Sequence, residues 1–255
     1  MTIDPSAKGL HYERWFKVQA YDMGPGARVK LGSLLNYFQE GASEHAEKLG
    51  ASVIHMSSKN LTWVMSRYHI RIFRYPLWKE SLLLTTWPSV QKELAALREF
   101  EARDEGGLML AAATSSWMLL DIKGKKPVLL GNNLPEYPRD PRRAIPDAFG
   151  PLPKPEKTDL ELSFRVQNRD LDWNRHVNHV VYLDWAVDTA PQEMLENLAP
   201  AEIEVDFRGE ALHGEVVLCR TEVISSGEEP ILSHQIIRED DEKELTRLRT
   251  LWKKF

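Results

Sequence analysis

The chain has 255 residues, of which 42% are hydrophobic and 28% charged, and its formal net charge is −5. This apolar content is enough for a folded core, and the acidic balance argues against a protein that binds nucleic acid through a broad basic surface. No apolar run approaches the roughly 20 residues that cross a bilayer, and the N-terminus lacks the regions of a secretion signal, so we expect a cytoplasmic protein that is not bound to a membrane.

The first half of the chain reads as a strand, a turn, a helix and further strands. An extended segment at 11–21 leads through a turn rich in glycine and proline at 22–32 into an amphipathic helix at 33–50. Ser33 is the expected N-cap and Gly50 the expected stop. Alternating apolar and polar residues then predict antiparallel strands. These strands are expected at 63–75, 82–90, 94–104 and 108–122.

A proline-rich segment separates the two halves. Eight of the fifteen prolines fall between Asp121 and Leu160, where no helical or strand period survives. We therefore expect an inter-domain linker at 136–160, between a first domain at 1–135 and a second at 161–255.

The second half repeats the plan of the first. "FKVQAYDM" from Phe16 and "FRVQNRDL" from Phe164 share four residues in register, at an offset of 148. A strand at 162–167, a turn and a helix from about Val177 follow, and Pro191 is expected to break that helix. Four strands are again predicted at 201–209, 214–225, 231–240 and 244–255. The economical arrangement is an α+β tandem, or double, hot dog, in which each half wraps an antiparallel sheet around a long helix.

Polar residues crowd the turn before the second helix, in "DLDWNRHVNHVVYLDW". Asp170, Asp172 and Asn174 match the first three ligand positions of an EF-hand loop. The sixth position is Arg175 instead of glycine and the twelfth is Val181 instead of glutamate, so the calcium loop is excluded.

Two further interpretations involve the histidines. His176 and His179 stand three apart, but no HExxH pattern supports a metal site, and we expect neither a metal nor a cofactor. Acid/base catalysis by His176 is favoured if the segment is extended, because Asp172, Asn174 and His176 would then point the same way. Turn formation and helix capping explain the Asp and Asn residues equally well, and the spacing alone leaves both open.

The motif closely resembles the active-site segment of the plant and bacterial acyl-[acyl carrier protein] thioesterases, which are double hot-dog enzymes. The first half agrees, since "LLNYFQEGASEHAEKLG" and "WVMSRYHIRIFRYPLW" are similar to the N-terminal helix and following strand of that family. The resemblance covers nearly the whole chain, from about Tyr12 to Trp252.

The resemblance implies a set of catalytic residues. The Asp, Asn and His of the family motif correspond to Asp172, Asn174 and His176. A further Glu, found in the family in an aromatic-x-x-Glu-Cys pattern, corresponds to Glu210 after Phe207.

The neighbouring cysteine of the family pattern is absent here, because Ala211 follows Glu210. The single cysteine, Cys219, excludes an internal disulfide and is expected to be a buried apolar residue rather than a thiolate. No G-x-S-x-G elbow is present either, so water is the expected nucleophile.

By analogy with the family, Glu210 and His176 would polarise that water while Asp172 supports the histidine and Asn174 positions the water or the carbonyl. The backbone N–H groups of Val177 and Asn178, at the start of the second helix, are the expected oxyanion donors. In the family the first hot dog houses the acyl chain. The expected lining residues, for which an ordinary core position is the competing interpretation, are Phe38, Trp63, Met65 and Trp117.

The expected activity is hydrolysis of fatty acyl-acyl carrier protein, with acyl carrier protein as the partner. That partner is acidic, so a basic docking surface is expected. Acyl-coenzyme A hydrolysis, a non-catalytic acyl-thioester sensor and a dehydratase are the alternatives, and the sequence leaves acyl chain length and a homodimer open. Candidate docking residues are Lys123–Lys126, Arg139, Arg142, Arg143, Arg67, Arg71 and Arg74.

Overall fold

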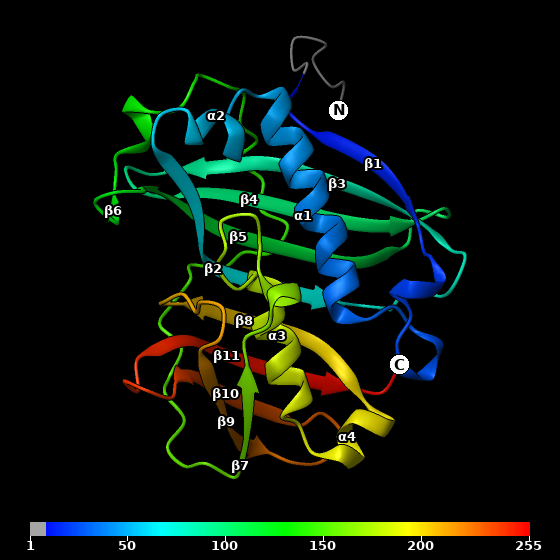
Figure 1. The fold of residues 1–255 in the computed structure, drawn as a ribbon. Helices are drawn as coiled ribbons and strands as arrows, with labels where there is room; N and C mark the ends of the chain where they lie inside the picture. Colours follow the sequence, from blue (N-terminus) through cyan, green and yellow to red (C-terminus); the bar gives the residue numbers. More distant parts are fainter. Residues whose placement is uncertain (1–8) are drawn as a thin grey trace.

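A computed structural model describes residues 9–255 and arranges them as one antiparallel sheet with the long helices on one face (Figure 1). Residues 1–8, the start of the predicted first domain and of the segment examined for a secretion signal, lie outside the described residues. The predicted α+β double hot dog is confirmed. Within the described part of the chain no helix is long and apolar enough to cross a membrane.

The N-terminal half follows the predicted order of strand, turn, helix and strands. A short 3-10 turn stands on either side of Met23, and a second, short helix follows the long one. The elements are β1 (Tyr12–Lys17), η1 (Ala20–Asp22), η2 (Pro25–Ala27), α1 (Leu31–Lys48), α2 (Val53–Ser57), β2 (Leu61–Ile72), β3 (Ser81–Gln91), β4 (Ala96–Asp104), β5 (Met109–Asp121), β6 (Lys126–Pro127) and η3 (Leu130–Asn132).

The C-terminal half repeats this order with a shorter central helix. Pro191 stands as the N-cap of a separate helix after that one, which confirms the predicted break. The elements are β7 (Leu160–Arg165), η4 (Asn168–Asp170), α3 (His179–Asp188), α4 (Gln192–Asn197), β8 (Ala199–Phe207), β9 (Val216–Ser225), β10 (Ile231–Arg238) and β11 (Glu244–Lys253).

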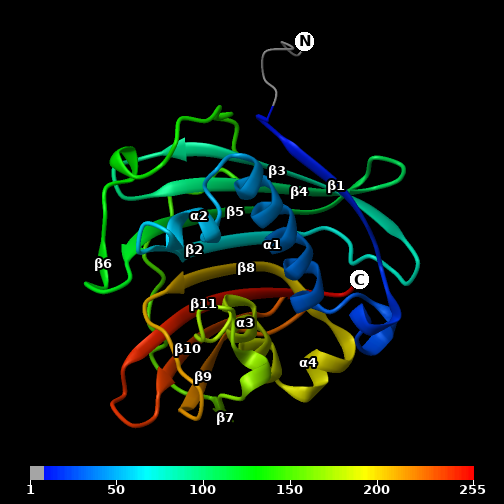
Figure 2. The same ribbon diagram turned by 45° about the horizontal axis from the view of Figure 1, so that its top comes forward.

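The two halves share a single sheet of eleven strands. Its order is β1-β3-β4-β5-β2-β8-β11-β10-β9-β7, with β6 paired to β5. The halves meet where β2 pairs with β8, for example Ile70 opposite Ile203, and Figure 2 shows these strands side by side. Both of these side chains are buried, so the apolar core runs without interruption from one half into the other.

Helix α1 begins two residues before the position that its sequence predicts. Lys30 is the N-cap and its side chain makes no capping bond, so the expected cap at Ser33 is wrong. Buried side chains then follow one face of the helix at a spacing of three and four residues. Gly50 ends it as predicted: at φ +68° it adopts the left-handed conformation that glycine tolerates, and the N–H of Ala51 donates to Ala46.

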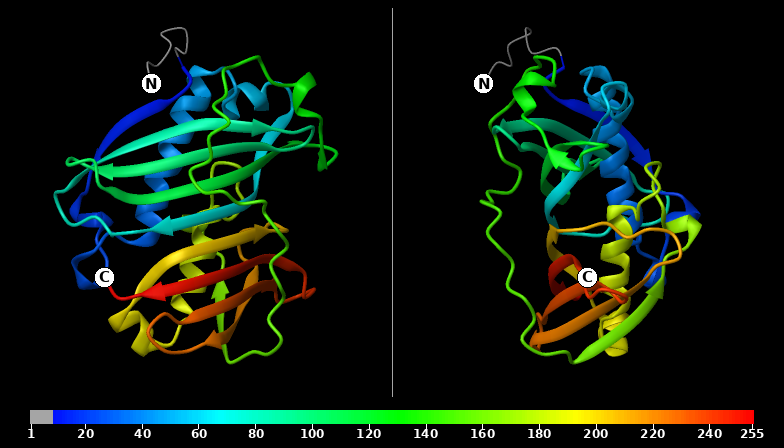
Figure 3. Two further views of the ribbon diagram at one scale, coloured as in Figure 1. Left: turned by 180° about the vertical axis from the view of Figure 1, so that it is seen from behind. Right: turned by 60° about the vertical axis from the view of Figure 1, so that its left-hand side comes forward.

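The segment between the halves is a strap across the back of the sheet, on the face opposite the helices (Figure 3). Residues 133–159 contain no helix or strand, in line with the proline content. The strap is nevertheless fixed: Arg143 pairs with the fully buried Glu99, and Glu99 also accepts from the N–H of Ala144. A buried carboxylate needs such partners, so this contact ties the strap to the N-terminal half.

Candidate active site

The turn that carries His176 is a tight hairpin, so the extended conformation that would align Asp172, Asn174 and His176 is not present. The N–H of Asp172 donates to the carbonyl of His176 at 2.7 Å, and the N–H of Arg175 donates to Asp172 at 3.0 Å. Arg175 has a φ of +63°. A turn followed by one left-handed residue is the usual three-residue hairpin loop. The alternation of polar residues therefore does not point them to one side.

Asp172 holds the backbone of this hairpin. One of its carboxylate oxygens, Oδ1, accepts from the N–H of Asn174 at 2.8 Å and from the N–H of His176 at 3.2 Å. Within residues 9–255 its carboxylate makes no hydrogen bond or ion pair with the imidazole of His176, so these bonds hold the backbone of the turn. The side chain of Asn174 lies exposed at the tip of the turn.

The helix that follows is capped by Asn178, whose side chain accepts from the N–H of Val180 at 3.0 Å. Both expected oxyanion donors already have acceptors in this structure: the N–H of Val177 donates to Ala211 at 3.0 Å and that of Asn178 to Asp170 at 2.8 Å. Among the described residues the first α3 amide without an acceptor is that of His179.

His176 and Glu210 meet although they lie on different segments. Nδ1 of His176 is 3.3 Å from Oε2 of Glu210, and both side chains are partly exposed. The loop with Glu210 is fixed on both sides. The N–H of Ala211 donates to the hydroxyl of the buried Tyr182 on α3 at 2.9 Å, and Arg238 donates to the carbonyl of Glu210 at 3.0 Å. The predicted convergence of these two catalytic candidates is thus observed.

A third charged group reaches the site from the other half. Nζ of Lys125, in the loop between β5 and β6, donates to Oε1 of Glu210 at 2.8 Å. In Figure 2 this hairpin lies on the same side of the sheet as the end of β8 that leads to Glu210. Burial by itself would raise the pKa of Glu210, but the hydrogen bond from Lys125 and the charge of His176 outweigh it and lower that pKa. Glu210 is therefore ionised at neutral pH.

The N-terminal half contains a turn with a similar backbone, in which Gly26 is left-handed as well. The N–H of Gly24 donates to the carbonyl of Arg28 at 2.8 Å, as that of Asp172 does to His176. Ala27 has a φ of +57°, close to the value at the corresponding position of the second half. Arg28 pairs with Leu77 as His176 pairs with Leu212, so counting two residues back from Leu77 places Tyr75 where the second half has Glu210.

This first turn carries no acid/base pair. Tyr75 is buried and donates its hydroxyl to the carbonyl of Pro200 at 2.8 Å, while Arg28 donates to the carbonyl of Phe255. The N-terminal half thus keeps the shape of the turn without the polar side chains that the C-terminal half has there.

Family models match nearly the whole chain. The N-terminal domain of acyl-ACP (acyl carrier protein) thioesterases matches residues 9–135, and the C-terminal domain matches residues 153–254. The chain belongs to the acyl-ACP thioesterase family. As such it is a thioester hydrolase, as the resemblance of its motif predicted.

Characterised relatives of this acyl-ACP thioesterase are distant in sequence. It is 25% identical to dodecanoyl-[acyl-carrier-protein] hydrolase of Cinnamomum camphora, over 96% of this chain and 68% of that protein. It is 27% identical to oleoyl-acyl carrier protein thioesterase 1 of Arabidopsis thaliana, over 96% and 77%. The fold matches the 12:0-ACP thioesterase of Umbellularia californica with a TM-score of 0.84 and 23% identity, over 96% of this chain and 95% of that chain. Both sequence relatives are named chloroplastic, and the cytoplasmic location predicted here stays a prediction.

The single cysteine of the thioesterase is buried and does not act as a nucleophile in this environment. Cys219 is fully buried on β9, and burial raises the pKa of its thiol to about 11. A thiol in that environment is protonated at neutral pH and is a poor nucleophile. The position after the glutamate is Ala211, also fully buried.

The four expected acyl-lining residues do not form one group. Phe38 on α1 stacks on Phe100 at 5.3 Å, and Met65 lies opposite Trp117 where β2 pairs with β5. Phe38 and Met65 belong to the main core, and Trp117 packs against it. Trp63 packs instead in a separate cluster and donates its indole N–H to Ala51 at 2.7 Å.

A hollow of about 400 Å³ is present in the N-terminal half, away from the His176 turn. It is lined by residues of β1, by Ser81 on β3 and by Glu105, and by none of the four expected residues. The lining of the acyl pocket stays a prediction.

Sequence reasoning missed three residues at the site. Lys125 was expected only as a docking residue, Tyr182 was quoted in the motif without a role, and His179 was considered only as a metal ligand. His179 packs among aromatic rings, with Tyr68 at 6.2 Å and Trp117 at 6.4 Å, and burial lowers its pKa to about 4. It is a neutral residue at the boundary between the active-site turn and the N-terminal half.

The candidate docking residues do not form one surface. The lysine loop lies beside Glu210, whereas the arginines are engaged elsewhere. Their partners are Gln91 for Arg139, Glu101 for Arg142, Glu99 for Arg143, Asp206 for Arg67, Glu202 for Arg71 and Glu80 for Arg74.

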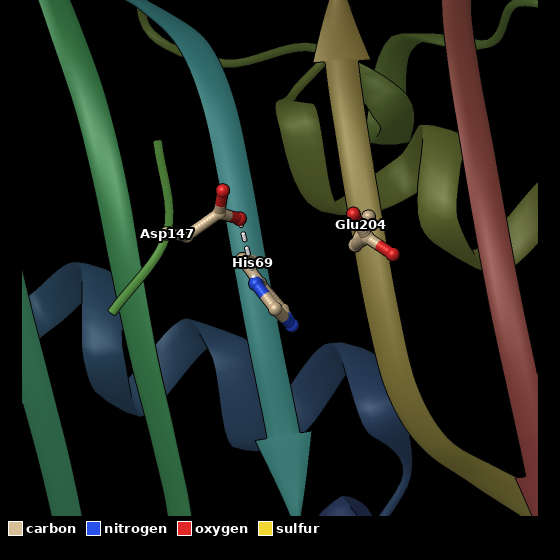
Figure 4. Close-up of side chains that lie close together, drawn as sticks. All are labelled: His69, Asp147 and Glu204. Carbon is tan, nitrogen blue, oxygen red and sulfur yellow. Dashed lines mark hydrogen bonds and ion pairs between the residues drawn. The ribbon is translucent and has the colours of Figure 1, made fainter. Parts of the chain in front are cut away.

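A cluster with metal-ligand chemistry lies at the seam of the two halves, away from the active site (Figure 4). His69 on β2, Asp147 on the strap and Glu204 on β8 place ligand atoms within 4.8 Å of one another. Both nitrogens of His69 are already held, by Asp147 at 2.7 Å and by Glu202 at 2.8 Å, and Glu204 pairs with Arg249. These contacts fasten the strap across the seam.

Proposed function

We propose that this acyl-ACP thioesterase cleaves its substrate with a water molecule that His176 activates, without a covalent acyl-enzyme. The contact between His176 Nδ1 and Glu210 is the observation that carries the proposal. A carboxylate can only accept, so Nδ1 carries the proton and Nε2 keeps the lone pair of a base. Glu210 then holds the ring and stabilises the imidazolium that forms, as the carboxylate of a catalytic triad does.

The reaction needs two proton transfers through one nitrogen. The water oxygen attacks the thioester carbonyl while its proton passes to Nε2 of His176. The carbon–sulfur bond then breaks, and the departing sulfur takes the proton back from Nε2. The products are a free fatty acid and the thiol of the carrier, and His176 returns to its starting state.

The amide of His179 is the candidate donor for the oxyanion, in place of Val177 and Asn178. It is the first residue of α3 and lies three positions beyond the base, where the helix dipole also favours negative charge. Removing one such donor costs about 3 kcal/mol in other hydrolases. The role proposed for Asn174, which is exposed in this turn, is to position the water or the substrate carbonyl.

We propose that the acyl chain packs along a row of aromatic rings in the N-terminal half. The row runs from His179 through Tyr68 to Phe100, with Trp117 at its side. Phe38 stacks at the far end of the row. Rings of this size give an apolar wall, and displacing one lengthens or shortens the space available.

Two measurements test the proposal. Intact-mass spectrometry during turnover should show no acylated protein, and Cys219→Ala should keep the activity; a trapped acyl-enzyme would overturn the mechanism. A panel of ACP and coenzyme A thioesters with short to long acyl chains should show higher kcat/KM for the ACP forms, and equal values would favour the coenzyme A alternative.

A further inference from the structure

Glu210 contacts a side chain from each half of the molecule, and the two distances differ. Lys125 approaches one carboxylate oxygen to 2.8 Å, while His176 lies 3.3 Å from the other. Only the first of these distances is a normal hydrogen-bond length for charged partners. The stronger contact in the free enzyme is thus with a lysine from the N-terminal half, not with the proposed base.

The loop beneath Lys125 is well fixed, so the side chain alone has to move. The N–H of Lys125 donates to Asp121 at 2.8 Å, and Asn60 donates to the carboxylate of Asp121 at 3.1 Å. The lysine side chain is 74% exposed. An ion pair of this kind is worth little in water, and a competing anion can displace it.

Exposed cations from both halves lie on the segments that meet at Glu210, although the chain is acidic overall. Lys123 and Lys126 are exposed on the same hairpin as Lys125. From the C-terminal half, the charge of Lys243 acts on Glu210, and the exposed Arg175 stands in the His176 turn. Such a rim attracts an acidic protein and repels a basic one.

We propose that Lys125 is a positioning residue that holds Glu210 away from His176 until an acidic carrier protein draws the lysine off. Glu210 then forms a normal hydrogen bond with Nδ1 of His176, and this bond supports Nε2 as the base. Hydrolysis is thereby coupled to docking of the carrier, and free thioesters are cleaved slowly. This inference rests on the proposed roles of His176 and Glu210.

The test compares one acyl chain on three carriers: ACP, coenzyme A and bare pantetheine, which has neither protein nor phosphate. For acyl-pantetheine, Lys125→Met should raise kcat about two- to fivefold, the range that an exposed ion pair supports. For acyl-ACP the same variant should leave kcat unchanged and raise KM. Lys125→Arg should restore both values.

Lys123→Met is the matched control, because it removes the same charge from the same hairpin without a contact to Glu210. It should raise KM for acyl-ACP and leave kcat for acyl-pantetheine unchanged. A merely structural or steering role of Lys125 would make the two variants alike.

Unchanged or lower kcat for acyl-pantetheine in Lys125→Met would overturn the inference. If Lys125→Met changes kcat and KM for acyl-coenzyme A in the same way as for acyl-ACP, the displacing group is a phosphate and not an acidic protein. Glu210→Gln distinguishes failure of this inference from failure of the proposed function. If Glu210→Gln slows hydrolysis of neither acyl-ACP nor acyl-pantetheine, the proposed mechanism fails. If Glu210→Gln is slow but Lys125→Met changes nothing, only the role of Lys125 is removed.

Discussion

The turns before α1 and α3 have similar backbones and differ in chemistry. Both are closed by corresponding hydrogen bonds, Gly24 to Arg28 and Asp172 to His176. The first contains two left-handed residues, Gly26 and Ala27, and the second contains one, Arg175. The first presents Arg28, whose guanidinium is held by a backbone carbonyl, and the second presents His176 beside Glu210. The fold supplies the position, and the side chains decide whether the position can move a proton.

The difference also separates structural polar residues from catalytic ones. Gly24 closes the first turn with no side chain at all, so the carboxylate of Asp172 is not required for the turn to form. Its two backbone acceptor bonds add rigidity at the one position that carries a base. In the proposed mechanism His176 and Glu210 are the acid/base pair, and Asp172 holds the turn that carries His176.

The largest expected effect comes from removing the base. His176→Ala should lower kcat/KM for acyl-ACP by about 10²- to 10⁴-fold, the usual contribution of a general base. Arg28→Ala, the matched change in the first turn, should stay within about threefold of the parent enzyme, because Arg28 donates to the carbonyl of Phe255 and takes no part in the His176–Glu210 pair. Steady-state kinetics on both variants checks this, and equal losses would end the distinction between the two turns.

Asp172 is tested by two substitutions with different chemistry. Asp172→Asn keeps an oxygen acceptor for the N–H groups of Asn174 and His176 and should retain most of the activity. Asp172→Gly copies the first turn and should lower kcat about tenfold, in line with the loss of one to two backbone hydrogen bonds. If the asparagine variant is as slow as the glycine variant, the negative charge matters and Asp172 acts on the imidazole after all.

The acyl path is tested with two tryptophans of neighbouring strands. Trp117→Ala opens space next to His179 and should shift preference by several fold toward longer or branched chains, since one or two methylenes in a pocket change specificity by about tenfold. Trp63→Ala, in the separate cluster, should leave the chain-length profile unchanged. A shift with Trp63 and none with Trp117 would place the pocket elsewhere.

The smallest change concerns stability at mild acid pH. His234 is fully buried between the hydroxyls of Thr221 and Thr250, and burial lowers its pKa to about 3 from 6.5. The unfolded chain therefore takes up its proton first, so this stability is present above about pH 6.5 and is lost as the pH falls.

Urea unfolding of the parent protein and of His234→Gln at pH 7 and pH 5 measures this effect. The fall in unfolding free energy between the two pH values should be smaller in the variant, by about 2 kcal/mol. An equal fall in both proteins would show that His234 is already charged or exposed in the native state.

Local signals predicted much of the fold. The helix ending at Gly50, the break at Pro191 and the 148-residue repeat each follow from the conformational limits or spacing of the residues themselves. The joining of the halves did not, because alternation shows which face of a strand is buried but not which strand lies beside it. The pairing of β2 with β8 depends on buried residues such as Ile70 and Ile203 that are ordinary in sequence.

The site was predictable where chemistry is tied to residue type. His176 and Glu210 were identified through the motif, and the structure brings them together. The sequence did not show which backbone amides already have acceptors. The N–H of Val177 donates to Ala211, which is distant in the chain, and that of Asn178 donates to Asp170 before the turn. Lys125 was missed for the same reason, since a contact across 85 residues leaves no local pattern.

The hydrolysis rate of Glu210→Gln tests the central claim most directly. Glutamine keeps the shape of the side chain but removes the charge that holds His176 in its working tautomer. We expect kcat for acyl-ACP to fall about 10²-fold or more, with KM little changed and an unaltered fold by circular dichroism. A kcat within about threefold of the parent enzyme would show that the two residues do not act together, and the proposed mechanism would be contradicted.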